Sequence, residues 1–272
     1  MPHHKNKKHC LADVQNSKDT RNIPIDKVGI RGLSYPITLM DKNYHQQSTV
    51  ATINMYVDLP HEFKGTHMSR FIEVLNQYQR TIDIHAISEL LLYIKAKLNS
   101  KSAHVELHFP YFIEKKAPVT QSPALLDYNC RLVAGIDSNN ISETTLTVDV
   151  PVTSLCPCSR EMSEHGAHNQ RSIVTISACL NSLVWIEELI AYAEQCGSAE
   201  VYALLKRADE KFVTDYAYDH PRFVEDIARE VSVRLMNDNR IDRFSVSVEN
   251  FESIHNHNAY AFITRDKKKQ QP

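Results

Sequence analysis

Residues 154–168 hold the side chains of this chain that are best suited to chemistry, and they read SLCPCSREMSEHGAH. Cys156 and Cys158 flank a proline, and His165 and His168 follow within twelve residues. Thiolate sulfur and neutral imidazole nitrogen are ligands that Zn²⁺ and similar cations prefer. No second close Cys/His pair follows at zinc-finger spacing, so a metal here would also need residues from distant segments and would keep an open coordination position. The same spacing fits two half-buried cysteines beside a polar loop, and both interpretations stay open.

Carboxylates and histidines at three later positions also have a chemical and a structural interpretation. Glu210 lies in a charge-dense segment that is typical of a solvated helix end. Glu225 falls in the first turn of a helix predicted over 223–236, where the helix dipole alone favours a carboxylate. His255 and His257 lie between the last two predicted strands, either as polar loop residues or as a proton-transfer pair. None of these positions decides between its two interpretations by itself.

The residues before the helix predicted over 71–78 could bind an anion. Lys64, His67, Ser69 and Arg70 lie in this short stretch. Free N–H groups at a helix start, the helix dipole and two cations together favour a phosphate group. A solvated helix start explains the same composition, so this assignment also stays open.

The elements that must position these residues follow from the apolar periodicity. Helices are predicted over 71–78, 86–98, 184–195 and 223–236. Alternation predicts strands over 34–39, 50–59, 104–112, 127–136, 145–152, 172–180, 244–248 and 258–264. The order strand, strand, helix, helix, strand, strand therefore occurs twice. This order predicts an α+β fold with antiparallel strands and helices on one face.

The same pattern divides the chain into four parts. Residues 1–25 are polar and basic, which predicts a disordered leader. We expect the first structural unit over 26–143 and the second, with most of the candidate metal site, over 144–265. The lysine-rich residues 266–272 are expected to form a flexible tail.

The composition excludes several classes of protein. The chain has 272 residues and a formal net charge of −2, so no electrostatic argument favours nucleic acid or an anionic membrane as a partner. It contains neither a Gly-x-Gly-x-x-Gly sequence nor a Walker loop, which disfavours a dinucleotide site and a P-loop. Its six cysteines are scattered, and no apolar run approaches about 18 residues. We therefore expect a protein of the reducing cytoplasm.

Four short sequences, taken together, resemble one enzyme family. They are GTHMSRF at 65–71, SLCPCS at 154–159, RFVED at 222–226 and ESIHNHNA at 252–259. In this order they resemble type IB GTP cyclohydrolase I, over about residues 25–265. The resemblance implies the tunnelling fold, with two tandem units of antiparallel sheet and paired helices in each subunit, and a homotetramer with the active site at a subunit interface. It also implies the conversion of GTP and water to 7,8-dihydroneopterin triphosphate and formate, the first step of folate and pterin biosynthesis.

The resemblance also assigns roles to individual residues. By position, Cys156, His168 and Glu210 are similar to the ligands of one divalent metal per subunit, with Zn²⁺ favoured and Mn²⁺ or iron as alternatives. His255 is similar to the catalytic histidine, and Cys156 counts among the catalytic residues through the metal. Glu225 is similar to the carboxylate that binds guanine. No role is assigned to Cys158.

These residue types suit that reaction. A divalent metal lowers the pKa of bound water towards about 7, and a histidine can move protons as the imidazole ring opens. The guanine edge offers two parallel donors to a carboxylate. The segment with Lys64, His67, Ser69 and Arg70 could bind the triphosphate, in its own or a neighbouring subunit's site.

Two other functions stay open on the sequence alone. The NADPH-dependent nitrile reductase of the queuosine pathway has the same fold and uses a cysteine nucleophile without a metal. The set Cys156, His168 and Glu210 argues against that enzyme. A non-catalytic metal-binding protein is the second alternative.

Overall fold

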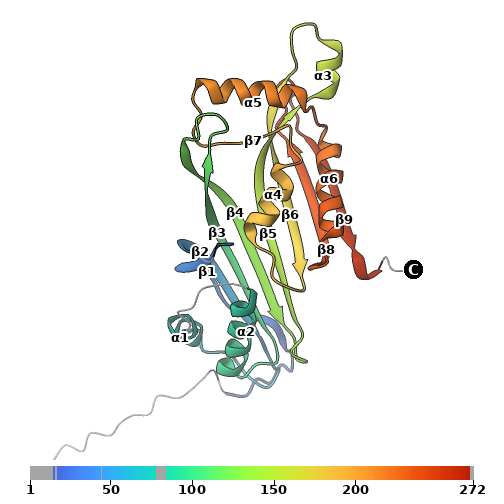
Figure 1. Ribbon diagram of the computed structural model, residues 1–272. Coiled ribbons are helices and arrows are strands. Elements are labelled where there is room, and N and C mark those ends of the chain that lie inside the picture. The colour runs from blue at the N-terminus through green and yellow to red at the C-terminus, as the bar shows by residue number, and fades with distance from the viewer. Residues whose placement is uncertain (1–14, 16, 44, 78–83, 270–272) are drawn as a thin grey trace, which may run out of the picture.

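Alternating apolar and polar residues build long strands, which join into one antiparallel sheet in the computed structural model (Figure 1). The structure describes residues 15, 17–43, 45–77 and 84–269. Within them the strands are β1 (Ile25–Met40), β2 (Gln46–Leu59), β3 (Ala103–Lys116), β4 (Pro123–Ile136), β5 (Ser142–Leu155), β6 (Asn169–Leu180), β7 (Ala199–Glu200), β8 (Ile241–Asn250) and β9 (Ala259–Asp266). The sheet order is β1-β2-β3-β4-β5-β6-β8-β9, and the two-residue β7 pairs with the end of β5.

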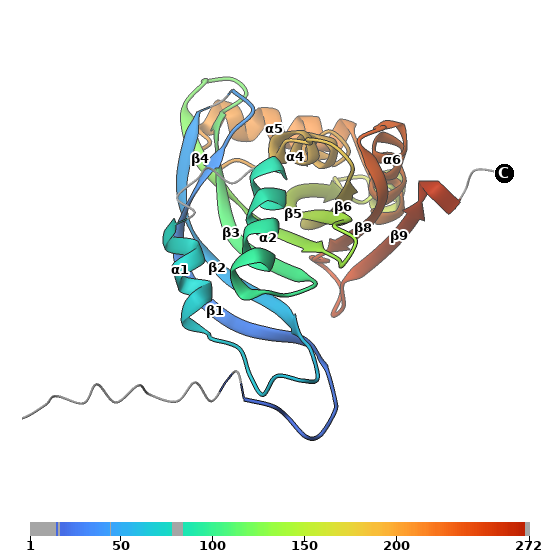
Figure 2. The ribbon, with the colours of Figure 1, turned by 90° about the horizontal axis from the view of Figure 1, so that it is seen from below.

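The helices pack on the sheet in two groups. They are α1 (Ser69–Gln77), α2 (Ile84–Leu98), α3 (Pro157–Met162), α4 (Ile186–Glu194), α5 (Arg207–Asp219) and α6 (Val224–Asn237), followed by the 3₁₀ turn η1 (Lys267–Lys269). Helix α2 packs on β3 and β4, α4 packs on β5, and α6 packs on β8 and β9 (Figure 2). The sequence-based prediction of an α+β fold with antiparallel strands and helices on one face is confirmed, and the architecture is consistent with the tunnelling fold that the resemblance implies. The division into units over 26–143 and 144–265 stays a prediction.

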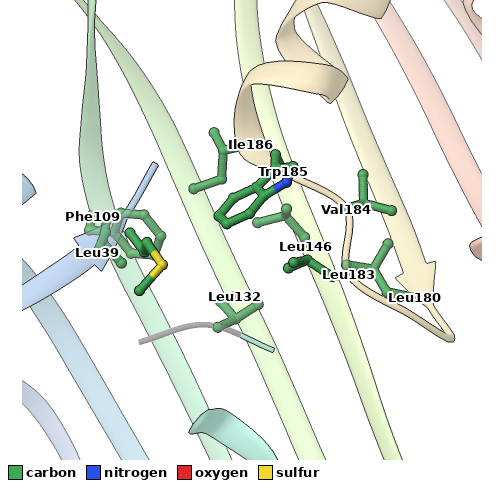
Figure 3. Close-up of a pocket in the computed structure, with 10 residues that line it drawn as sticks. Leu39, Phe109, Leu132, Leu146, Leu180, Leu183, Val184, Trp185 and Ile186 are labelled. Carbon is green, nitrogen blue, oxygen red and sulfur yellow. The ribbon is translucent and has the colours of Figure 1, made fainter. Parts of the chain in front are cut away.

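A single row of apolar side chains on each strand forms the core. Cys130 of β4 lies opposite Val148 of β5, which lies opposite Ile176 of β6, and all three are buried. Their side chains therefore share one face of the sheet, which the helices cover. A small apolar cavity of about 50 Å³ lies where β4 pairs with β5, and Phe109, Leu132, Leu146 and Trp185 are among the residues that line it (Figure 3).

Every strand and helix predicted from the periodicity is present, and most extend further than predicted. The prediction missed α3, β7 and α5. Helix α5 has no apolar stripe, because its only buried side chains in the described chain are Asp209 and Ala217. The other two elements are six and two residues long, too short for a periodic signal.

The predicted leader and tail both include residues that contact the folded units. Lys18 forms a β-bridge with Phe63, and the backbone N–H of Lys64 donates to the carbonyl of Ser17 at 3.1 Å. Near the C-terminus, Lys267 Nζ donates to the carbonyl of Asp238 at 2.7 Å. Residues 1–14, which make up most of the predicted leader, lie outside the described residues.

Two expectations about the environment can be compared with the structure. Cys130, Cys156, Cys158, Cys179 and Cys196 are all free thiols, and Cys10 lies outside the described residues. In the described part of the chain, no helix is long and apolar enough to span a membrane.

Candidate active site

A polar cavity of about 290 Å³ lies where β5 ends and where β6 and α6 begin. Five residues singled out from the sequence line it: Cys156, His168, Glu225, His255 and His257. They come from three segments that are far apart in the chain. The structure therefore brings a thiol, imidazoles and a carboxylate to one site.

Cys156 and His168 are held together by their backbones. The N–H of Cys156 donates to the carbonyl of His168 at 3.1 Å, directly after the last paired residues of β5 and β6. Ser159 closes the turn between them, because its Oγ donates to the carbonyl of Cys156 at 3.1 Å and accepts from the N–H of His168 at 3.2 Å. Cys156 also caps α3, its Sγ accepting from the N–H of Ser159 at 3.5 Å.

The other residues of the Cys-Pro-Cys segment lie elsewhere. We expected alternation to place both cysteines on one face if the strand continued through them. The strand instead ends at Leu155, and Pro157 begins α3, which leaves Cys158 exposed. His165 lies in a non-helical loop, also exposed, so it does not share a helix face with His168.

The imidazole of His168 is oriented by two side chains that the sequence analysis missed. Its Nδ1 lies 2.9 Å from Gln170 Oε1 and 3.8 Å from Glu252 Oε2, and Gln170 Nε2 donates to Glu252 Oε1 at 3.4 Å. With Gln170 as the acceptor, Nδ1 carries the hydrogen and Nε2 keeps its lone pair. This arrangement is typical of histidines that bind a metal through Nε2.

The sequence carried a partial signal for these two residues. Glu252 belongs to the ESIHNHNA sequence, although only its histidines were considered. Gln170 continues the inward-facing row of β6 and is 7% exposed, so it is a polar side chain at a core position.

His255 and His257 lie on the exposed side of the cavity, in the loop between β8 and β9. Their rings stack with centroids 5.2 Å apart. The rings of His255 and His168 meet edge to face at 6.4 Å. His255 is thus the loop histidine that lies in ring contact with the cavity wall at His168.

Glu225 is the second residue of α6 and is exposed at the rim of the cavity. The capping carboxylate of this helix is Asp226, whose Oδ2 accepts from the N–H of Phe223 at 3.0 Å. In the described part of the chain, no side chain bonds to the carboxylate of Glu225. Its oxygens are therefore available to a ligand.

A buried network joins the end of α4 to β3 and β4. Lys115 Nζ lies 2.7 Å from Glu194 Oε1, which also accepts from the hydroxyl of Tyr128 at 2.7 Å. Burial raises the pKa of Glu194 although Lys115 acts in the opposite direction. The network fixes the end of α4, and Ser198, which follows it, accepts from the N–H of Leu155 at 2.9 Å.

Glu210 lies away from this cavity. It is exposed in the first turn of α5, whereas the other end of α5 reaches α3 through Tyr218, whose ring lies 4.9 Å from the guanidinium of Arg160. Glu210 and Tyr218 are eight positions apart, which corresponds to about 12 Å along the helix axis. Within one chain, Glu210 is thus separated from the pair Cys156 and His168.

The candidate anion-binding residues also lie apart from the cavity. Lys64, His67, Ser69 and Arg70 precede or begin α1. Figure 1 shows α1 at the opposite end of the molecule from α3 and α5. One chain alone does not bring these side chains to Cys156.

The donor set fits a metal only in part. Among the described residues, no group of three or more His, Cys, Asp or Glu side chains is arranged to hold a metal ion. Cys156 and His168 nevertheless present a sulfur and an oriented imidazole nitrogen to the same cavity, which are the donors that Zn²⁺ prefers. These two residues fit a divalent ion that takes a third protein ligand from another chain or from a local rearrangement.

Comparison with known proteins gives a consistent result. Residues 11–261 match the family model for type I GTP cyclohydrolase folE2. The chain is 55% identical over 261 residues to "GTP cyclohydrolase FolE2" of Geobacter sp. (strain M21), which covers 96% of this chain and 97% of that protein. It is 57% identical over 260 residues to the protein of the same name from Geotalea uraniireducens (strain Rf4), covering 96% and 95%.

Solved structures of distant proteins share the fold. The uricase from Arthrobacter globiformis superimposes with a TM-score of 0.55 at 7% identity, over 91% of this chain and 95% of that one. The uricase from Bacillus fastidious gives a TM-score of 0.53 at 6% identity, over 92% and 94%. At such low identity the likeness concerns the fold alone.

Proposed function

The chain belongs to the type I GTP cyclohydrolase FolE2 family, and from this membership we propose that its polar cavity hydrolyses GTP to 7,8-dihydroneopterin triphosphate and formate. We assign it to the type IB class and to the first step of folate and pterin biosynthesis in the cytoplasm. The supporting observation is that Cys156, His168, Glu225 and His255 line one cavity. Family membership favours this function over the nitrile reductase.

In this proposal Glu225 binds the guanine base. Its carboxylate accepts hydrogen bonds from N1–H and from the 2-amino group, two parallel donors that a carboxylate matches in geometry. Because Asp226 already caps α6, Glu225 can turn both oxygens to the base. The interaction would fix the purine with its five-membered ring toward Cys156 and His168.

A divalent metal would be held by Cys156 Sγ and His168 Nε2, with Zn²⁺ favoured and Mn²⁺ or iron as alternatives. When bound, it would supply the Lewis acidity that activates water for attack at C8 at neutral pH. Gln170 and Glu252 keep the His168 ring in the orientation that presents Nε2.

His255 would move the protons of the reaction. A proton delivered to N7 of the purine makes C8 more electrophilic and assists opening of the imidazole ring. A histidine is suited to this task because its ordinary pKa lies near neutrality. Its exposed position between His168 and His257 lets it exchange protons with solvent after each turnover.

We also propose that the active site is completed by a second copy of the chain in a homotetramer. Glu210, the third ligand in this proposal, lies about 12 Å along α5 from the residue that contacts α3. The triphosphate-binding candidates Lys64, His67, Ser69 and Arg70 lie at the other end of the molecule. Contributions from a neighbouring subunit would reconcile these positions with their roles.

The test is incubation of the purified, metal-loaded chain with GTP, followed by oxidation and measurement of pterin fluorescence. The proposal predicts fluorescent product from the wild type and little from the Glu225→Gln variant. Metal uptake without any pterin would instead identify a non-catalytic metal-binding protein.

A further inference from the structure

A layer of polar side chains lies between the apolar core and the polar cavity. Along β5, β6 and β8 the inward-facing rows consist mainly of valines and other apolar residues, which end at Val152, Val174 and Val248. Ser172 is paired with both Val152 and Asn250, so the row on β5 ends one inward position later than the other two. At the next inward position the three strands carry Ser154, Ser172 and Asn250, which are 0%, 0% and 3% exposed. Burial of polar groups is costly unless each is hydrogen-bonded, so their partners matter.

These three side chains form one directed hydrogen-bond chain. Ser172 Oγ donates to Asn250 Oδ1 at 2.6 Å, and Asn250 Nδ2 donates to Ser154 Oγ at 3.0 Å. Ser154 Oγ then donates to the backbone carbonyl of Arg222 at 2.9 Å. The central amide fixes the direction, because its oxygen can only accept and its nitrogen can only donate.

This series of hydrogen bonds ends at Arg222, in the segment that leads into α6. Besides its carbonyl bond to Ser154, Arg222 donates its backbone N–H to the carbonyl of Leu155 at 3.0 Å. Its Nη1 also donates to Glu230 Oε1, near the middle of α6, at 2.8 Å. Both backbone groups of Arg222 are thus tied to the last two residues of β5. Cys156 follows these residues directly, and Glu225 lies three residues after Arg222.

We propose that Ser172, Asn250 and Ser154 are positioning residues that set the distance between Glu225 and the Cys156–His168 wall, and thereby the selectivity for guanine over a purine without the 2-amino group. This inference rests on the proposed function of the cavity. A carboxylate distinguishes guanine from hypoxanthine only if it meets N1–H and the 2-amino group together. A shift of the Arg222–Glu225 segment would weaken the hydrogen bond from the 2-amino group to Glu225 and leave the one from N1–H in place.

The test compares Ser154→Ala with the matched variant Ser177→Ala. Each substitution removes one serine hydroxyl from the same sheet. Among the described residues, Ser177 Oγ bonds only to Thr147 Oγ1, at 2.6 Å, on the opposite face of the sheet and away from the cavity. For each variant, kcat and KM are measured with GTP and with inosine triphosphate. Amide hydrogen exchange of residues 220–226 is measured without any nucleotide.

We expect Ser154→Ala to lower the preference for GTP over inosine triphosphate by about tenfold, chiefly through the KM for GTP. We also expect faster exchange in residues 220–226. Ser177→Ala should leave both readouts at the wild-type values, and Ser154→Thr, which keeps the hydroxyl, should restore them. A general loss of stability would lower turnover of both nucleotides equally and leave the preference unchanged.

Equal preference in Ser154→Ala and the wild type, together with unchanged exchange, would overturn the inference. If Ser154→Ala does not fold, Asn250→Asp takes its place in the test. The aspartate carboxylate has nearly the same shape as the asparagine amide but can only accept hydrogen bonds, so it would accept the hydrogen that Ser154 Oγ otherwise donates to the carbonyl of Arg222. The variant should therefore show the same lower preference for GTP and the same faster exchange. If the wild type does not turn over GTP, the proposed function fails. The amide exchange of residues 220–226 then decides separately whether the hydrogen bonds from Ser172 through Asn250 and Ser154 hold this segment in place.

Discussion

Replacing Glu225 with glutamine is the substitution that reports most directly on guanine recognition. The side chain keeps its size and its place in the first turn of α6, but one acceptor oxygen becomes a donor NH₂. Two parallel purine donors cannot both bond to that group, so one is left facing another donor. An unsatisfied polar group costs about 1–3 kcal/mol, which corresponds to a loss of about tenfold to a hundredfold in kcat/KM.

The assay is steady-state turnover of GTP and of inosine triphosphate, with Asp226→Asn as the control. Inosine triphosphate offers only N1–H, which the remaining amide oxygen can still accept, so its kcat/KM should fall less than that of GTP. Asp226→Asn removes a charge from the same helix turn but keeps an oxygen for the cap, and it should stay within about twofold of the wild type. Unchanged GTP turnover in Glu225→Gln would refute the assignment of this residue to guanine.

The remaining predictions concern the metal, the proton transfer and the fold. Cys156→Ala should abolish stoichiometric metal binding in elemental analysis, and full retention of metal would remove Cys156 from the ligand set. His255→Ala should keep the metal and the fold but lose about 10²–10⁴-fold in kcat. Loss of the metal would instead identify His255 as a ligand. Activity within a few fold of the wild type would assign the proton transfer to the neighbouring His257. If Glu210 acts across a subunit interface, mixed assemblies of Cys156→Ala and Glu210→Ala chains should regain turnover that neither variant has alone; no recovery would contradict that role. Lys115→Met should lower the free energy of unfolding by about 3–5 kcal/mol in urea titrations, because Glu194 loses its buried partner. Removal of Lys115 takes away the contact that lowers the pKa of Glu194, so burial raises that pKa further in the folded variant. The loss should therefore grow as the pH rises above the ordinary range of a carboxyl group, and a pH-independent loss would contradict the account.

The sequence predicted the elements well wherever one face of an element is buried. The alternating row that ends at Val152 of β5 and the apolar stripe of α2 both follow from burial on one side, which periodicity detects. Helix α5 was missed because its buried positions are occupied by Asp209 and Ala217. Asp209 accepts from the backbone N–H groups of Val119 and Thr120, a contact with a distant hairpin that local sequence cannot reveal.

The site was predictable as a set of residues but not as a geometry. Cys156, His168, Glu225 and His255 were selected from motifs, and the fold brings them to one cavity. Their roles, and that of Glu210, stay predictions. The position of Glu252 beside His168 could not be predicted, because it depends on the register between β6 and β8 and on the loop after β8. Local periodicity gives strands, whereas cross-strand register is set by the whole sheet.

The most direct test of the account measures formate and oxidised pterin together after the metal-loaded wild-type chain has consumed a known amount of GTP. Opening of the imidazole ring at C8 and closure to a pterin release one formate for each pterin formed. The account predicts equal amounts of both products from the wild type, and a parallel loss of both in Cys156→Ala. Consumption of GTP without formate, or equal product formation by Cys156→Ala, would contradict the claim that this cavity performs the reaction.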